Sequence, residues 1–232
     1  MKKWGLLNLS TMLLGLLTIA YQPLALATAS TSTTLGFYSI TNSNTGAVTD
    51  GEANLSVEVI DAGGNQVQFK FTNNSTSSLA DVYFDDGTLL GIASITDSGS
   101  GVAFSQFASP GNLPAANNAS PAFMTTAGFS ADSDPAVSPN GVSQGEWLTI
   151  TFNLVGGKTY ADTIAALTLP NGGGAGDLRI GVHVQSFASG GGSESFVNTP
   201  VPEAETYAMM LAGLGLVGFM GAVRKRSLLA AV

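Results

Sequence analysis

A serine inside a Gly-x-Ser-x-Gly pattern is the first group whose surroundings could perform chemistry. The pattern occupies residues 141–145, and Asp162 or Asp177 and then His183 follow it in the chain order of α/β-hydrolase triads. A nucleophile of that kind needs a strand before the serine and a helix after it. Here a proline-rich stretch precedes Ser143 and a strand pattern follows it. The sequence therefore does not favour a serine hydrolase, and we predict no catalytic residue.

Two pairs of closely spaced aspartates are the densest carboxylate groups, Asp85 with Asp86 and Asp132 with Asp134. Carboxylate oxygens are ligands that Ca²⁺ prefers, but neither pair starts an EF-hand loop, which ends in a glutamate at its twelfth position. Asp85 and Asp86 precede a glycine, so we expect a turn whose side chains bind its own backbone in preference to an ion site. A glycosidase acid pair is a further alternative. We predict no cofactor, with Ca²⁺ as the ion that these aspartates could bind.

The only histidine and one tryptophan lie in strand patterns. His183 falls on the polar face of its strand, and we expect a surface or edge residue that makes an ordinary hydrogen bond. Trp147 shares an outward face with Thr149 and Thr151, where its ring could stack on a sugar. The alternative for Trp147 is packing against a neighbouring loop.

Apolar and polar residues alternate with a period of two in several stretches, which predicts the β-strands that would position these residues. Residues 55–59 and 67–72 alternate on either side of Gly63 and Gly64, which predicts an antiparallel hairpin with one wet face. Apolar and polar residues also alternate over residues 148–154 and 178–184, which predicts two further strands. We expect further short strands at 79–84, 89–95, 102–107 and 194–197, and one or two helical turns at 162–167.

The stretch 108–145 breaks this rhythm with five prolines, and its aromatic residues suggest that it packs over the rest of the domain. About eight short strands without helix–strand alternation predict an all-β fold. We expect an antiparallel β-sandwich, of jelly-roll type, over residues 28–199.

The charge of this predicted domain is strongly negative. Residues 28–199 contain fourteen acidic and three basic residues, a net charge of −11. Such a surface would repel nucleic acids and anionic membranes. The chain has no cysteine, so it cannot use disulfides, thiolate catalysis or cysteine-bound zinc.

The N-terminus has the pattern of a secretory signal peptide. Lys2 and Lys3 precede an apolar run over residues 6–20, and the small residues Ala25 and Ala27 follow it. A positive region, a short apolar region and an Ala-x-Ala site make up such a signal. We predict that residues 1–27 are removed by signal peptidase after export.

The C-terminal residues 200–232 read as a short acidic box, an apolar span and a basic stop. Residues 207–223 carry no charge and would form a single transmembrane helix at the short end of the range that crosses a bilayer. Three basic residues would hold the end of the helix in the cytoplasm: Arg224, Lys225 and Arg226. The domain before the helix would then lie on the far side of the membrane.

This order resembles the PEP-CTERM sorting signal of exopolysaccharide-producing Gram-negative bacteria. The likeness begins at Val201 and rests on Pro202 and Glu203, whereas Ala204 replaces the second proline of the family's Pro-Glu-Pro box. The resemblance implies that a membrane-embedded transpeptidase, the exosortase, recognises these residues and processes the chain there.

From both ends together we expect a non-enzymatic protein of the cell surface or the exopolysaccharide matrix, with a structural or binding role and with exopolysaccharide as its partner. The alternatives are a secreted hydrolase that acts on matrix polysaccharide and a calcium-dependent carbohydrate-binding module. Before processing, the tail would anchor the protein in the inner membrane.

Overall fold

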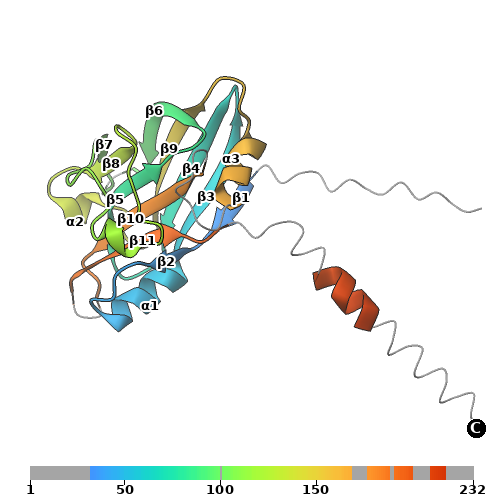
Figure 1. The fold of residues 1–232 in the computed structure, drawn as a ribbon. Coiled ribbons are helices and arrows are strands. Elements are labelled where there is room, and N and C mark those ends of the chain that lie inside the picture. Colours follow the sequence, from blue (N-terminus) through green and yellow to red (C-terminus); the bar gives the residue numbers. More distant parts are fainter. Residues whose placement is uncertain (1–31, 100, 169–176, 189–190, 201–209, 218–232) are drawn as a thin grey trace, which may run out of the picture. The chain divides into compact units, whose positions relative to one another are not determined.

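The computed structural model describes residues 32–99, 101–168, 177–188, 191–200 and 210–217 (Figure 1). Within them the elements follow in the order β1 (Ser32–Leu35), β2 (Phe37–Ser39), α1 (Thr45–Asn54), β3 (Leu55–Gly63), β4 (Gln66–Asn73), β5 (Ser78–Asp85), β6 (Leu89–Asp97), β7 (Phe104–Gln106), the 3-10 helix η1 (Ala116–Asn118), β8 (Ser130–Ser133), α2 (Val137–Asn140), β9 (Glu146–Leu154), α3 (Tyr160–Thr168), β10 (Arg179–Gln185) and β11 (Ser193–Asn198). Each predicted strand is present, and β1, β2 and β8 are additional.

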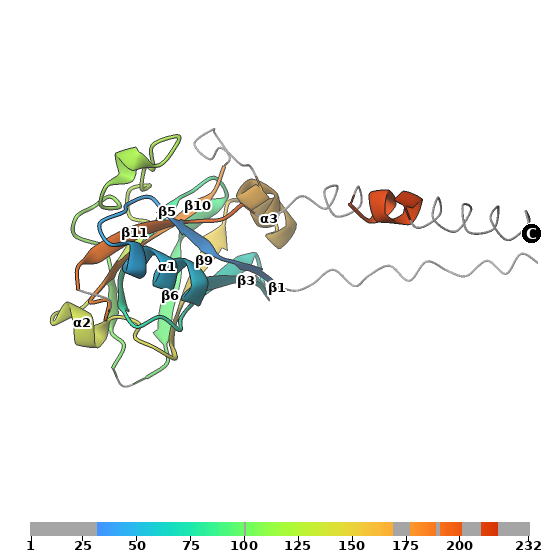
Figure 2. The ribbon, with the colours of Figure 1, turned by 90° about the horizontal axis from the view of Figure 1, so that it is seen from below.

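Two antiparallel sheets make up the described domain. One has the order β1-β3-β4-β9-β6 and the other the order β2-β11-β10-β5-β8-β7. They lie in separate layers with their apolar faces toward each other (Figures 1 and 2). The predicted antiparallel sandwich is therefore confirmed, while its finer assignment to the jelly-roll type stays a prediction.

The predicted hairpin is the most regular part of the five-stranded sheet. β3 and β4 pair from Leu55 opposite Asn73 to Gly63 opposite Gln66, and β9 continues the ladder along β4. Gly63 and Gly64 in the turn both have positive φ, at 69° and 56°, a region that glycine enters without steric cost. The buried positions of β4 alternate with half-buried ones, as expected for a sheet with one face in water.

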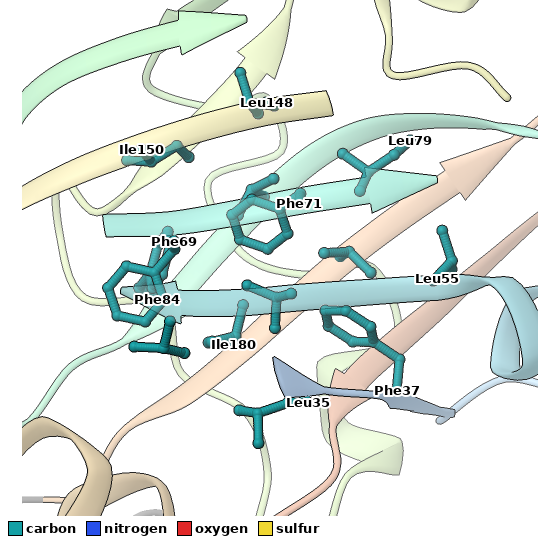
Figure 3. Close-up of a cluster of buried hydrophobic side chains, with 14 of the residues drawn as sticks. Leu35, Phe37, Leu55, Phe69, Phe71, Leu79, Phe84, Leu148, Ile150 and Ile180 are labelled. Atoms are coloured by element: carbon teal, nitrogen blue, oxygen red, sulfur yellow. The ribbon is translucent and has the colours of Figure 1, made fainter. Parts of the chain in front are cut away.

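Phenylalanine rings join the two layers (Figure 3). Phe84 of the six-stranded sheet contacts Phe69, Phe71 and Phe152 of the five-stranded sheet, with ring centroids 5.0, 6.2 and 4.6 Å away. All three pairs are edge-to-face, a geometry worth about 0.5–1.5 kcal/mol per pair beyond the apolar area that is buried. These rings lie fully buried at the centre of the core.

The segment 108–123, which we call the covering segment, packs on the outer face of the six-stranded sheet. It contributes Leu113 and Phe123 to a second apolar cluster with Tyr83 of β5 and Val197 of β11. The strand β5 is consequently buried on both faces for most of its length. The prediction that the proline-rich stretch packs over the sandwich is confirmed, although this stretch also contains β8 and α2.

The helix α1 joins β2 of one sheet to β3 of the other. Its N-cap residue Asn44 accepts hydrogen bonds from the N–H groups of Gly46 and Ala47. On its buried side, Gly51 lies directly against the ring of Phe196, and a Cβ added to Gly51 would be 2.3 Å from the Phe196 Cζ atom. The helix therefore requires glycine at this position for close packing.

The outer strands of both sheets are short or irregular. β1, β2 and β7 have four, three and three residues. β6 is longer, with nine residues, but its pairing with β9 shifts register at two places. The edge strands of both sheets therefore present only short or interrupted rows of backbone N–H and C=O groups.

In the C-terminal tail, residues 210–217 are helical, and they are the described part of the predicted span 207–223. Among the described residues, no helix reaches the length and apolar character that a membrane crossing needs.

Candidate functional site

A histidine and two aspartates meet on the outer face of the six-stranded sheet. His183 of β10 lies opposite Asp81 of β5, and Asp81 lies opposite Asp132 of β8. The Nδ1 atom of His183 is 2.8 Å from Oδ2 of Asp81, and both side chains are largely buried. Ser195 of β11 and Ser105 of β7 occupy the neighbouring register positions on either side. We call these five residues the polar row.

Burial disfavours the ionised forms of side chains in and next to the polar row. Burial raises the pKa of Asp132 to about 6, and a hydrogen bond and the charge of Asp81 act in the same direction. Burial, followed by the charges of these two aspartates, also raises the pKa of Tyr83 above its usual range. The protonated Tyr83 hydroxyl donates to the carbonyl of Pro110 at 3.1 Å and so fastens the covering segment.

His183 makes the hydrogen bond that its strand pattern predicts, but it lies on a central strand. The expectation of an edge position is wrong, because β11 pairs with β10 on one side and β5 on the other. With Asp81 on Nδ1, the arrangement has the orientation of a histidine–aspartate pair in a hydrolase.

Ser143 is not part of this row. The helix α2 precedes it and β9 follows it, the reverse of the strand and helix that flank a nucleophile elbow. Asp162 lies on α3, where its carboxylate accepts a hydrogen bond from Thr159. In the described part of the chain, no hydrogen bond joins any two of Ser143, Asp162 and His183. The structure therefore does not assemble a triad from Ser143, Asp162 and His183.

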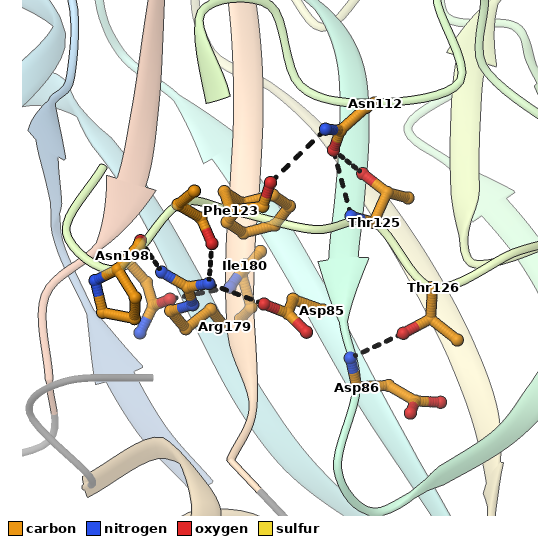
Figure 4. Close-up of polar contacts among 11 residues, drawn as sticks. Asp85, Asp86, Asn112, Phe123, Thr125, Thr126, Arg179, Ile180 and Asn198 are labelled. Atoms are coloured by element: carbon orange, nitrogen blue, oxygen red, sulfur yellow. Dashed lines mark hydrogen bonds and ion pairs between the residues drawn. The ribbon is translucent and has the colours of Figure 1, made fainter. Parts of the chain in front are cut away.

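Asp85 belongs to a buried network that holds the covering segment (Figure 4). The Arg179 guanidinium is 2.7 Å from the Asp85 carboxylate and donates to the carbonyls of Pro121 and Ala122 at 2.7 and 2.8 Å. Its Cζ atom is 5.2 Å from the centroid of the Phe123 ring. The expectation that Asp85 binds its own turn is wrong, because a cation from a strand distant in sequence takes its carboxylate.

The other candidate carboxylates have separate surroundings. The N–H of Asp86 donates to Thr126 Oγ1, and burial together with the charge of Asp85 raises the pKa of Asp86 to about 6. Asp134 accepts a hydrogen bond from Ser105 Oγ at 2.8 Å. Over the described ranges, no three His, Asp or Glu side chains are grouped so that they could hold a metal ion.

Trp147 lies at the start of β9 on the outer face of the five-stranded sheet. The Lys70 ammonium is 5.2 Å from the centroid of its ring, within the range of a cation–π contact. A sugar would have to displace this cation or use the other face of the ring. The sugar-stacking role of Trp147 stays a prediction.

Three residues with defined polar roles were not identified from the sequence. Asp81 and Arg179 lie inside apolar strand patterns, and only the pairing of β5 with β10 reveals their partners. Ser186 follows β10 directly and has φ of 61°. The sequence signal that could have identified Arg179 is its isolation as one of three basic residues within the predicted domain.

Several predicted sites lie outside the described residues. They are the signal-peptide residues Ala25 and Ala27, the sorting box Val201, Pro202, Glu203 and Ala204, and the basic stop Arg224, Lys225 and Arg226.

Comparison with known proteins identifies the C-terminal tail. Residues 200–226 match the model of the PEP-CTERM protein-sorting motif, which confirms the resemblance seen in the sequence. This motif implies an exported protein that an exosortase processes and sorts to the cell surface. No curated protein matches the chain, and no solved structure does. The tail thus gives a destination, and the role of the sandwich must be argued from its own residues.

Proposed function

We propose that this protein is a non-enzymatic component of the cell surface or the exopolysaccharide matrix, where its sandwich has a structural or binding role. The observation that carries the proposal is the sorting motif at residues 200–226, which follows a two-layer β domain in the chain. Exopolysaccharide is the proposed partner. The acidic domain makes nucleic acid an unfavourable one.

The two ends of the chain have transient roles in this proposal. Signal peptidase removes residues 1–27 after Ala27, and residues 207–223 hold the exported protein in the inner membrane. The basic residues 224–226 keep the C-terminus in the cytoplasm. The exosortase then acts at Pro202, Glu203 and Ala204, which are a substrate for that enzyme.

The experiment is the intact mass and location of the protein in the producing cells. The wild type should be recovered from the surface or the medium with a mass that lacks both ends. Glu203→Gln changes the sorting box and should leave the protein in the membrane fraction with its tail. Glu205→Gln removes the same charge outside the box and serves as the matched control. Surface delivery of the Glu203→Gln protein with an intact tail would contradict exosortase sorting.

A secreted hydrolase of matrix polysaccharide is the second candidate, and the pairing of His183 with Asp81 favours it. A hydrolase would release new reducing ends from the matrix polysaccharide. His183→Gln would abolish that release, whereas Ser105→Ala at the far side of the polar row would change it little. If the wild type releases no reducing ends, the non-enzymatic proposal stands.

A further inference from the structure

A pocket lined by hydroxyl and amide side chains lies between the β4–β5 connection, the first turn of α2, the loop before β9 and the residue that follows β10. Its volume is about 310 Å³, at the lower end of the range of about 300–1,000 Å³ for small-molecule sites. All of its lining residues are serine, threonine or glutamine, among them Ser138, Ser143, Gln144 and Ser186. We call it the hydroxyl pocket. A second pocket, near α3, differs because Asp61 and Lys158 line it.

A buried asparagine holds the walls of the hydroxyl pocket in place. The Asn73 side chain donates to the carbonyls of Ser77 and Val142 at 2.9 and 2.7 Å. Its Oδ1 atom accepts from the N–H and the hydroxyl of Ser75 at 2.8 and 2.7 Å. The Asn73 carbonyl accepts from the N–H of Gly145 at 2.7 Å. A fully satisfied buried network of this kind fixes both loops before any ligand arrives.

The pocket retains unused hydrogen-bonding capacity. The Ser138 hydroxyl donates to Ser186 Oγ at 3.1 Å, so the Ser186 hydroxyl keeps its own hydrogen for another acceptor. Gln144 donates through Nε2 to the carbonyl of Asn74, which leaves Oε1 as an acceptor. Within the described residues, no hydrogen bond uses the Ser143 hydroxyl. The pocket thus offers both donors and acceptors, as needed for ligand hydroxyl groups, each of which both donates and accepts.

Two carboxylates accept hydrogen bonds from residues that line the pocket. Asp50 accepts from the N–H and the hydroxyl of Thr76. Burial opposes its ionisation, but the hydrogen bonds from Thr76 and Asn54 outweigh burial and lower the Asp50 pKa. Glu146 accepts from the N–H of Ser143 at 2.7 Å. These fixed negative charges disfavour an anionic ligand and leave neutral hydroxyl groups in the pocket.

Ser186 is held in a conformation that costs energy. Its φ of 61° lies in the left-handed region, where a residue other than glycine pays a steric penalty. Non-glycine residues in this region cluster at ligand-binding sites, where their conformation is part of the function. Here it places a serine hydroxyl at the wall of the pocket, in contact with Ser138.

We propose that the hydroxyl pocket binds one neutral glycosyl unit of the matrix polysaccharide. This inference rests on the proposed function and names the site and the ligand class. Neutral sugars match the unused hydroxyl and amide groups of the pocket, whereas chains rich in uronic acid would be repelled by the net charge of −11 over residues 28–199.

Ser186→Gly is the informative variant, because it removes a pocket hydroxyl and also relieves the left-handed strain. It should fold with a melting temperature at or above that of the wild type. Binding is measured by saturation-transfer NMR and affinity electrophoresis, on protein recovered from the producing cells. The probes are the neutral and the uronate-containing fractions of the extracellular polysaccharide from those cells. Ser94→Ala on exposed β6 is the matched control for the loss of a hydroxyl.

The wild type and Ser94→Ala should bind the neutral fraction equally. Ser143→Ala and Ser186→Gly should each weaken binding about threefold to tenfold, the effect of one lost hydrogen bond. Equal binding by Ser143→Ala, Ser186→Gly and the wild type would overturn the pocket assignment. Preference for the uronate fraction, or no binding by the wild type, would overturn the ligand class. Surface delivery of the protein would still be tested separately by the mass experiment.

Discussion

The buried pair of Arg179 and Asp85 should fasten the covering segment, and removing Asp85 tests this directly. The side chain of Arg179 is 8% exposed and that of Asp85 is 18% exposed. Breaking a fully buried pair from one side costs about 3–5 kcal/mol, because the remaining charge is left uncompensated. After Asp85→Ala, however, Arg179 would keep its two carbonyl acceptors in the covering segment. We therefore expect a loss of about 2–3 kcal/mol in the free energy of unfolding.

Urea denaturation at pH 7 measures this loss, and limited proteolysis shows where it acts. Cleavage within residues 108–123 should become faster in Asp85→Ala, because the guanidinium would lose the carboxylate that fixes it and would hold the covering segment less firmly. Asp85→Asn keeps the shape and one acceptor, so it should cost less than Asp85→Ala.

A double-mutant cycle separates the pair from its surroundings. The cycle compares Arg179→Met, Asp85→Ala and the variant that carries both substitutions. Their non-additivity in the free energy of unfolding should be about 1–2 kcal/mol, because the two groups are in contact. An Asp85→Ala protein that loses less than about 0.5 kcal/mol, with unchanged proteolysis of residues 108–123, would refute the fastening role.

Three further predictions concern packing, pH and calcium. Gly51→Ala should lower stability by about 1–3 kcal/mol through overpacking against Phe196, although alanine alone favours a helix; an unchanged or higher melting temperature would contradict the close approach. Folding raises the pKa of Asp86 and Asp132 from 3.8 to about 6, so the native state binds more protons between these two values and stability should fall as the pH rises from about 4 to about 6.5. Both carboxyl groups keep contact with water, so each contributes less than about 1 kcal/mol; Asp86→Asn should flatten the dependence of the urea midpoint on pH, and a midpoint that rises over this range would contradict the assignment. Millimolar Ca²⁺ should leave the melting temperature unchanged relative to EDTA, and an increase would instead support the calcium-dependent binding module.

The sandwich could be predicted from the sequence because its core strands follow the simplest rule of sheets. Successive residues of β3, β4, β9 and β10 point alternately to the core and to the outer face. The alternation of apolar and polar residues in the sequence therefore shows directly which side chains face the core. β8 was missed because its four residues, Ser130–Ser133, carry one apolar side chain between polar ones. Its place in the sheet comes from pairing with β5 and β7.

The helix α1 was missed for a related reason. Its sequence contains two glycines and a weak apolar face, and its stability comes from the Asn44 cap and from packing on Phe196. Tertiary contacts of this kind override local propensity and leave little trace in the chain.

The candidate site depended on strand register, which the sequence does not provide. His183 was recognised as a polar residue in a strand, but its partner Asp81 is set by the pairing of β5 and β10, which includes a register shift beside His183. A shift of one residue would turn Asp81 toward the core. The hydroxyl pocket likewise combines Ser78, Ser138 and Ser186, whose types are too common to stand out.

The short outer strands have a consequence for copies of this protein that are crowded together. A sheet edge with regular, unpaired backbone groups is a template on which another chain can add a strand. β1, β2 and β7 are too short for a stable ladder, and the register shifts of β6 interrupt the one long edge. Neighbouring molecules on a cell surface would therefore remain individual folded units and would not polymerise into fibrils through their sheets.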